Sequence, residues 1–128
     1  MNKLIFSAAI LSLITLFVHI FAGGQEIHIP ILESKLSVGM KAILSVVWHM
    51  ATAMLIMNSI ALLIAARSPD YQKPLILLIA SQYLSASVLF VYYGYFRLDS
   101  LMLMPQWIAF SSIAALALTG LYKKRIYA

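Results

Sequence analysis

The amino-acid sequence predicts an all-α membrane protein, a four-transmembrane-helix bundle with up-down topology and both termini in the cytoplasm. The first observation behind this fold class is that four stretches contain no Asp, Glu, Lys or Arg, at residues 4–24, 42–66, 74–96 and 100–122. A helix needs about 20 residues to cross a bilayer core of roughly 30 Å, and each stretch is long enough. The other two observations are the composition of the chain and the distribution of its basic residues.

The composition is that of a protein embedded in lipid. Hydrophobic residues make up 63% of the chain and charged residues only 10%, whereas a soluble domain has about 25% charged residues. Four spans leave no room for a soluble domain within 128 residues, so we expect a single integral membrane domain over residues 1–128. The chain contains no cysteine, which excludes disulfide bonds, thiolate metal ligands and cysteine nucleophiles.

The basic residues predict the orientation of the chain, because cytoplasmic loops of membrane proteins collect Lys and Arg. The net charge of +5 is then explained by topology rather than by nucleic-acid binding, and the short loops favour a bacterial inner membrane protein. With both termini inside, the cytoplasmic side holds Lys3, Arg67, Lys73, Lys123, Lys124 and Arg125, and the outer side holds Lys35, Lys41 and Arg97.

The first span is expected at about residues 3–24, where Gly23 and Gly24 would stop the helix. An outer loop should follow at residues 25–38. Its partial alternation of polar and apolar residues suits an extended or interfacial segment. Pro30 also disfavours a helix that continues through this region.

The remaining spans are separated by shorter turns. Ser34 or Ser37 should cap the second span, residues 38–66, whose length requires it to tilt or to project from the bilayer. A turn sequence occupies residues 67–73. The third and fourth spans follow at about residues 74–96 and 100–122, joined by a turn at residues 97–100, with Pro74 and Pro105 at or near their first turns.

Each predicted span carries one face of small or polar residues, if successive residues are placed 100° apart. Helices associate in lipid through small residues and interhelical hydrogen bonds, so these faces should form the interior. In the order of the spans, the four faces consist of Ala8, Ser12, Thr15, His19 and Gly23; of Lys41, Ser45, His49, Thr52 and Ser59; of Gln82, Ser85, Leu89, Tyr92, Tyr93 and Phe96; and of Gln106, Ala109, Ile113, Ala117 and Gly120.

The histidines are the strongest candidates for chemistry. His19 and His49 lie inside spans at similar depths below the outer surface, and His28 lies in the outer loop near Glu26. Ionisable groups inside a membrane are costly and are candidates for function by default. Two facing imidazoles can bind a metal ion or a haem iron, and a carboxylate can complete or orient such a site. We therefore predict a metal site of His19, His28, His49 and Glu26, with a metal ion or haem as the candidate cofactor.

A wider pocket for a cofactor would include further side chains near the outer surface. The same residues have a simpler explanation, because Trp and Tyr anchor spans at the interface and isolated histidines can merely hydrogen-bond to hydroxyl or carbonyl groups. Both interpretations stay open for the predicted pocket, which consists of His19, Trp48, His49, Tyr92, Gln106 and Trp107.

No sequence motif fixes a reaction. We expect a non-enzymatic accessory or assembly protein that acts through its bundle, with a membrane-protein partner or a second copy of the chain. The alternative is a membrane protein that binds a metal, haem or lipophilic ligand around His19 and His49. An enzyme acting on lipid would depend on the same histidines. A small proton-coupled transporter is disfavoured because the carboxylates lie in loops or at span ends, at Glu26, Glu33, Asp70 and Asp99.

Overall fold

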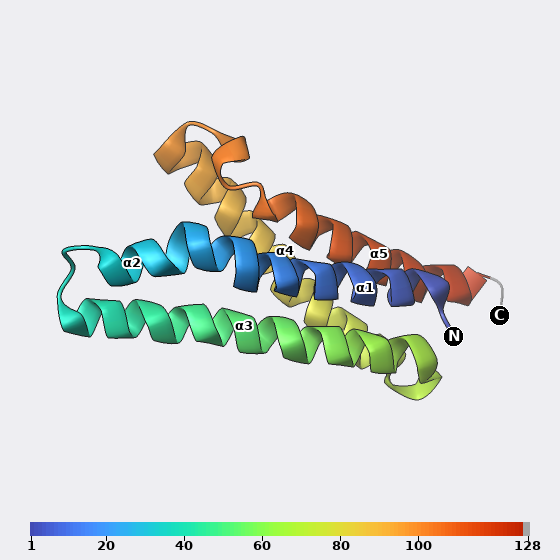
Figure 1. Cartoon of the computed structure of the whole chain (residues 1–128). Helices are drawn as coiled ribbons and strands as arrows, with labels where there is room; N and C mark the ends of the chain where they lie inside the picture. The colour runs from blue at the N-terminus through green and yellow to red at the C-terminus, as the bar shows by residue number, and fades with distance from the viewer. Residues whose placement is uncertain (127–128) are drawn as a thin grey trace.

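The computed structural model describes the backbone of residues 1–126 and the side chains of residues 1–123, and its regular structure in this range is helical (Figure 1). The side chains of Lys124 and Arg125, which contribute to the predicted orientation, lie outside the described part. The elements are α1 (Lys3–Val18), the π-helix η1 (His19–His28), α2 (Ile29–Glu33), α3 (Val38–Arg67), α4 (Pro69–Leu98), the short 3₁₀-helix η2 (Leu101–Leu103) and α5 (Gln106–Ile126).

Within the described residues, three helices are long and apolar enough to cross a membrane: Lys3–Glu33, Val38–Arg67 and Pro69–Leu98. The prediction of an all-helical chain with long apolar helices is confirmed at this level. The start of α3 also agrees with the sequence, because the Ser37 hydroxyl accepts a hydrogen bond from the N–H of Met40. The fourth helix, α5, is 21 residues long and packs against α1 and α4.

The first helix is longer than predicted. We expected it to end at the glycine pair, residues 23–24, and residues 25–38 to form a loop, but α1, η1 and α2 continue to Glu33 as one helix. In η1 the backbone hydrogen bonds span five residues instead of four, and the N–H of Ile29 still bonds to the carbonyl of Gly24. Pro30 is the second residue of α2 and, because it has no N–H, leaves one carbonyl of the preceding π-helix without an intrahelical donor.

The turn between α3 and α4 is shorter than predicted. We expected a turn over residues 67–73, but only Ser68 separates the two helices. Pro69 takes the first position of α4, where its fixed φ suits the helix and an N–H is not needed. Pro74 therefore lies inside α4 rather than at its start. The carbonyl to which Pro74 cannot donate belongs to Asp70, in the first turn.

The connection between α4 and α5 is longer than predicted. We expected the last span to begin at Ser100, but α5 begins at Gln106. Asp99 ends α4 in the left-handed conformation, with φ of 48°, which Asp tolerates better than most residues. The chain then turns tightly over α4, since a Cβ on Gly94 would lie 3.2 Å from the carbonyl oxygen of Ser100.

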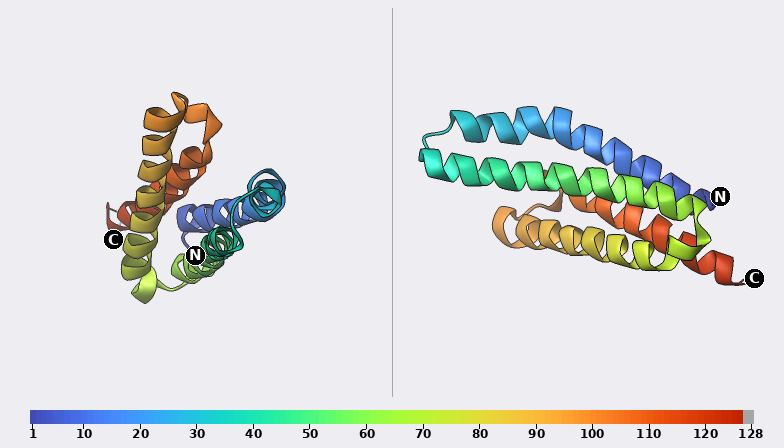
Figure 2. Two further views of the ribbon diagram at one scale, coloured as in Figure 1. Left: turned by 90° about the vertical axis from the view of Figure 1, so that its left-hand side faces the viewer. Right: turned by 90° about the horizontal axis from the view of Figure 1, so that it is seen from below.

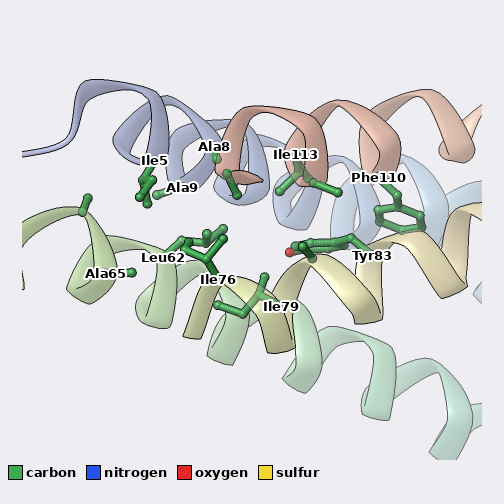
Figure 3. Packing of buried hydrophobic residues seen from close by; sticks show 14 of the residues in the cluster. Ile5, Ala8, Ala9, Leu62, Ala65, Ile76, Ile79, Tyr83, Phe110 and Ile113 are labelled. Atoms are coloured by element: carbon green, nitrogen blue, oxygen red, sulfur yellow. The ribbon is translucent and has the colours of Figure 1, made fainter. Parts of the chain in front are cut away.

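The helices form two hairpins that pack together near the chain termini. One hairpin consists of α1, η1, α2 and α3, and the other of α4 and α5; the most extensive contacts between them are of α1 with α5 and of α3 with α4 (Figures 1 and 2). Tyr83 is the largest fully buried side chain. The core around it includes Ile5, Ala8, Ala9, Leu62, Ala65, Ile76, Ile79, Phe110 and Ile113 (Figure 3).

Away from the termini the two hairpins diverge (Figure 2). There η1 and α2 pack on α1, on each other and on α3. The inward face predicted for the third span is wrong, because most of it is exposed: Ser85, Leu89, Tyr92, Tyr93 and Phe96. Bulky aromatic side chains keep helix backbones apart, whereas small ones allow close approach. The buried side of α4 instead carries Ile76, Ile79, Ala80, Tyr83 and Ser87.

Candidate functional site

The diverging part of the first hairpin contains an imidazole–indole stack centred on Trp48 of α3. The indole stacks on His19, with ring centroids 4.0 Å apart and planes 19° apart. It also stacks on His28, at 5.4 Å and 3°. Gly23 lies between the two histidines in sequence, and a Cβ there would lie 2.8 Å from Cη2 of Trp48. The indole therefore occupies the space between two imidazoles, over a backbone position without a side chain.

The π-helix is what places His19 and His28 on one face. Nine residues of α-helix make about two and a half turns and would put the two side chains on opposite sides. A π-helix has more than four residues per turn, so nine residues make about two turns. Because η1 runs from His19 to His28, both rings face α3. The unusual helix geometry and the stack are thus two parts of one arrangement.

Hydrogen bonds to hydroxyl groups of α3 fix both rings. The hydroxyl of Thr52 lies 3.1 Å from the carbonyl oxygen of Trp48 and donates to it. Oγ1 of Thr52 also lies 2.9 Å from Nε2 of His19, within hydrogen-bonding distance. Nε2 of His28 lies 3.2 Å from Oγ of Ser45.

His49 extends the stack toward the surface. Its exposed ring meets His28 edge to face, with centroids 5.4 Å apart and planes 80° apart. The structure thus pairs His49 with His28, whereas we expected it to face His19. Glu26 is exposed. Among the described residues no three His, Asp or Glu side chains form a group that could hold a metal ion, so the predicted four-ligand set does not come together.

The other predicted pocket residues belong to the second hairpin. Nε1 of Trp107 donates to the carbonyl of Leu101 over 3.2 Å, which anchors the α4–α5 connection. Tyr92 packs on Tyr93 and Phe96 of its own helix. Oε1 of Gln106 is buried and has no hydrogen-bond partner among the described atoms. Because the hairpins diverge, these residues lie with α4 and α5 rather than with the imidazole–indole stack.

A buried polar network joins the two hairpins at the level of the core. Oγ of Ser12 lies 2.7 Å from Oγ of Ser59 and 2.6 Å from the hydroxyl of Tyr83. Asn58 donates to Oε1 of Gln82 over 3.0 Å. Sequence reasoning placed the two serines on inner faces but missed Tyr83. The available signal was the spacing of Ile76, Ile79, Ala80, Tyr83 and Ser87 on one side of α4.

The arrangement holds its rings rigidly. Nε2 of His19 is hydrogen-bonded to Thr52, and Nε2 of His28 is hydrogen-bonded to Ser45. The exposed ring of His49 is therefore the part of the cluster most available to a ligand. Comparison of the chain with protein-family models, with curated proteins and with solved structures found no match.

Proposed function

We propose that this protein is a non-enzymatic accessory protein of a bacterial inner membrane that binds a partner membrane protein through its first hairpin. In this proposal the bundle has four spans with α5 as the fourth, both termini are cytoplasmic, and the connection from α2 to α3 is outside. The binding element is the outer arm, defined as residues 27–43. The observation that carries the proposal is the length of this hairpin.

The first hairpin is longer than a bilayer is thick. The 30-residue α3 is about 45 Å long at 1.5 Å per residue, against a hydrocarbon core of about 30 Å. The 31-residue first helix is slightly shorter than that rise implies, because it includes the ten-residue π-helix η1. Tilt alone would have to reach about 50° to bury the two helices, whereas membrane helices tilt by up to about 40°. Lys3 and Arg67 mark one end of the two apolar runs, and Glu26 and Lys41 the other. The excess length therefore lies at the α2–α3 end.

The outer arm exposes large apolar side chains beside the charged Glu33 and Lys35, although this proposal places it beyond the hydrocarbon. Val38 is 85% exposed and Ile43 61% exposed. Exposed apolar area costs about 25 cal/mol per Å² relative to burial, so a partner that covers the arm would be favoured. The remaining exposed apolar side chains of the arm are Ile27, Ile29, Leu32, Leu36 and Met40.

The imidazole–indole stack gives the outer arm a defined position. It joins η1 to α3 at the base of the arm through Trp48. At the tip, Nζ of Lys41 donates to the carbonyl of Leu32 over 2.7 Å. An arm fixed at both ends loses little conformational freedom on binding, which favours affinity. In this proposal the histidines support a binding surface and do not carry out a reaction.

Site-specific photocrosslinking in cells tests the proposed function. A photoreactive phenylalanine derivative at Val38 or Ile43 should crosslink to one discrete membrane protein. The matched control positions are Leu77 and Leu78, which are exposed on α4 at the level of the core and should crosslink to lipid. Equal crosslinking at all four positions would contradict the proposal. If the crosslinked product contains two copies of the chain, the outer arm mediates self-association and the accessory function is wrong.

Cysteine labelling tests the orientation separately. The chain has no cysteine, so one cysteine at Lys35 and one at Tyr71 report the two sides without background. In intact cells a membrane-impermeant maleimide should label position 35 and should label position 71 only after permeabilisation. The reverse pattern would overturn the proposed orientation and leave the length argument unchanged.

The second candidate function is ligand binding at the imidazole–indole stack. The exposed ring of His49 beside His28 is the observation that favours it. Protein purified in mild detergent should then show haem absorbance or a stoichiometric metal that is lost in a His28→Phe/His49→Phe variant. A signal that persists in the variant would exclude this site.

A further inference from the structure

A pocket of about 420 Å³ is lined by residues around the N-terminus. The N-terminus lies at the opposite end of the bundle from the connection between α2 and α3 (Figure 1). The pocket lies where the ends of α1, α3, α4 and α5 converge. Liquid water occupies about 30 Å³ per molecule, so the pocket has space for a phosphate group with part of its alcohol substituent. The lining residues are Met1, Asn2, Lys3, Leu4, Ala66, Arg67, Pro69, Gln72, Gly120 and Lys123.

The charged side chains of this pocket are all basic. Lys3 comes from α1, Arg67 from the end of α3 and Lys123 from α5, so three separate helices each contribute one cation. The lining includes no carboxylate; Asp70, next to the lining residue Pro69, is exposed and is not part of it. Three like charges repel one another, and an anion between them relieves that repulsion.

The backbone carbonyls around the pocket are already hydrogen-bonded. The N–H and Nδ2 of Asn2 donate to the carbonyls of Ala66 and Gly120, each over 2.7 Å. Nε2 of Gln72 donates to the carbonyl of Ala65 over 2.8 Å. The carbonyls of Ala65 and Ala66 belong to the last turn of α3, where the partial charge is negative, whereas Gly120 lies inside α5.

The helix ends at the pocket carry partial charges of both signs. The amino ends of α1 and α4 lie there and are positive, whereas the carboxyl end of α3 is negative. The side chains of Lys3, Arg67 and Lys123 make the electrostatic potential in the pocket positive.

From this geometry we propose that the pocket binds a phosphate-bearing anion, either the headgroup of an anionic phospholipid or a soluble phosphate. The chemistry is charge-assisted hydrogen bonding from one guanidinium and two ammonium groups to phosphate oxygens. Basic residues beside a membrane surface attract anionic lipid headgroups in the same way. The proposal does not depend on the outer arm or on its partner.

Binding to the full-length protein in detergent tests the site. The probes are dihexanoyl phosphatidylglycerol, dihexanoyl phosphatidylcholine and inorganic phosphate, with affinity from native mass spectrometry and the shift of the unfolding midpoint from circular dichroism. The test variant is Lys3→Gln/Arg67→Gln/Lys123→Gln. The control is Lys35→Gln/Lys41→Gln/Arg97→Gln, which removes the same charge at the opposite end. We expect the test variant to bind the anionic probe at least about tenfold more weakly and the control to bind it like the wild type.

The probes distinguish the two sources of phosphate. If phosphatidylglycerol binds and inorganic phosphate does not, the site is assigned to a lipid headgroup. If both probes bind and both lose affinity equally in the test variant, the site also accepts a free phosphate. Equal binding by wild type and test variant, or equal loss in the control, overturns the proposal. If the triple variant does not fold, the Lys3→Gln/Lys123→Gln variant with Arg67 retained must still show the loss.

Discussion

The indole of Trp48 packs directly on the backbone of Gly23, so that a methyl group at position 23 would lie 2.8 Å from Cη2 of the ring. Gly23 is therefore a packing feature, and neither glycine of the pair ends the helix. Gly24, the next residue, has no atom of another residue near its would-be Cβ. The two adjacent glycines thus provide a matched test of the imidazole–indole stack.

Gly23→Ala should destabilise the fold by about 1–3 kcal/mol, because the rigid indole has to move away from both histidines. Gly24→Ala should be neutral or stabilising by up to about 1 kcal/mol through helix propensity. Thermal unfolding in detergent, followed by circular dichroism, measures both. In a Trp107→Phe background, which leaves Trp48 as the single tryptophan, only Gly23→Ala should change the emission spectrum. Equal effects of the two substitutions would refute the close contact.

Gly120 provides the corresponding test of the contact between α1 and α5. A Cβ there would lie 2.7 Å from Cγ1 of Ile5 and 3.1 Å from its backbone nitrogen, which cannot move without displacing α1. We expect Gly120→Ala to cost about 1–3 kcal/mol. Gly39→Ala has open space around the new methyl group and is the control. A Gly120→Ala protein as stable as the wild type would show that α1 and α5 lie farther apart.

The hydrogen bond between Ser12 and Tyr83 predicts coupling between two helices of the core. Ser12→Ala leaves the buried hydroxyl of Tyr83 without that partner and should cost about 1–2 kcal/mol. Adding Tyr83→Phe to the Ser12→Ala variant should lower the free energy of unfolding little further, because the hydroxyl that lacks its partner is then absent. The measurement is a double-mutant cycle of unfolding free energies, in which strictly additive effects would argue against the bond. Ser7→Ala, at an exposed hydroxyl that bonds within its own helix, is the control.

Parts of this fold follow from the sequence because lipid imposes simple rules on packing. The predicted inner faces of the first and fourth spans contain the fully buried residues Ala8, Ser12, Ile113 and Ala117. Small residues let helices approach closely, and both spans have one distinct small face. The third span has no such small face, because large side chains surround the helix. Tyr83 is buried there by contacts with other helices, among them its hydrogen bond to Ser12 of α1 and its stacking on Phe110 of α5.

The candidate site was predictable in its residues but not in its arrangement. His19, His28, Trp48 and His49 all belong to the stack, as their unusual polarity inside or beside the apolar runs suggested. Their pairing depends on the π-helix, and the α- and π-forms of one segment differ by a shift of one hydrogen-bond acceptor. Neither composition nor periodicity records that shift. The divergence of the hairpins, which removes Gln106 from the site, is likewise a tertiary property.

The π-helix itself makes a prediction that cysteine pairs can test. In η1 the ring of His28 faces α3 and bonds to Ser45, while Ile27 is 41% exposed. An α-helix continuing from His19 would complete two turns near position 26 or 27 and turn His28 away. Cysteines at positions 28 and 45 should therefore be joined by a short bifunctional thiol crosslinker that spans the reach of the imidazole, and cysteines at 27 and 45 should not. Because the chain has no other thiol, protection from maleimide–polyethylene glycol in a gel-shift assay reports the crosslink directly. Preferential crosslinking of the 27–45 pair would show that this segment is α-helical and would remove the geometric basis of the stack.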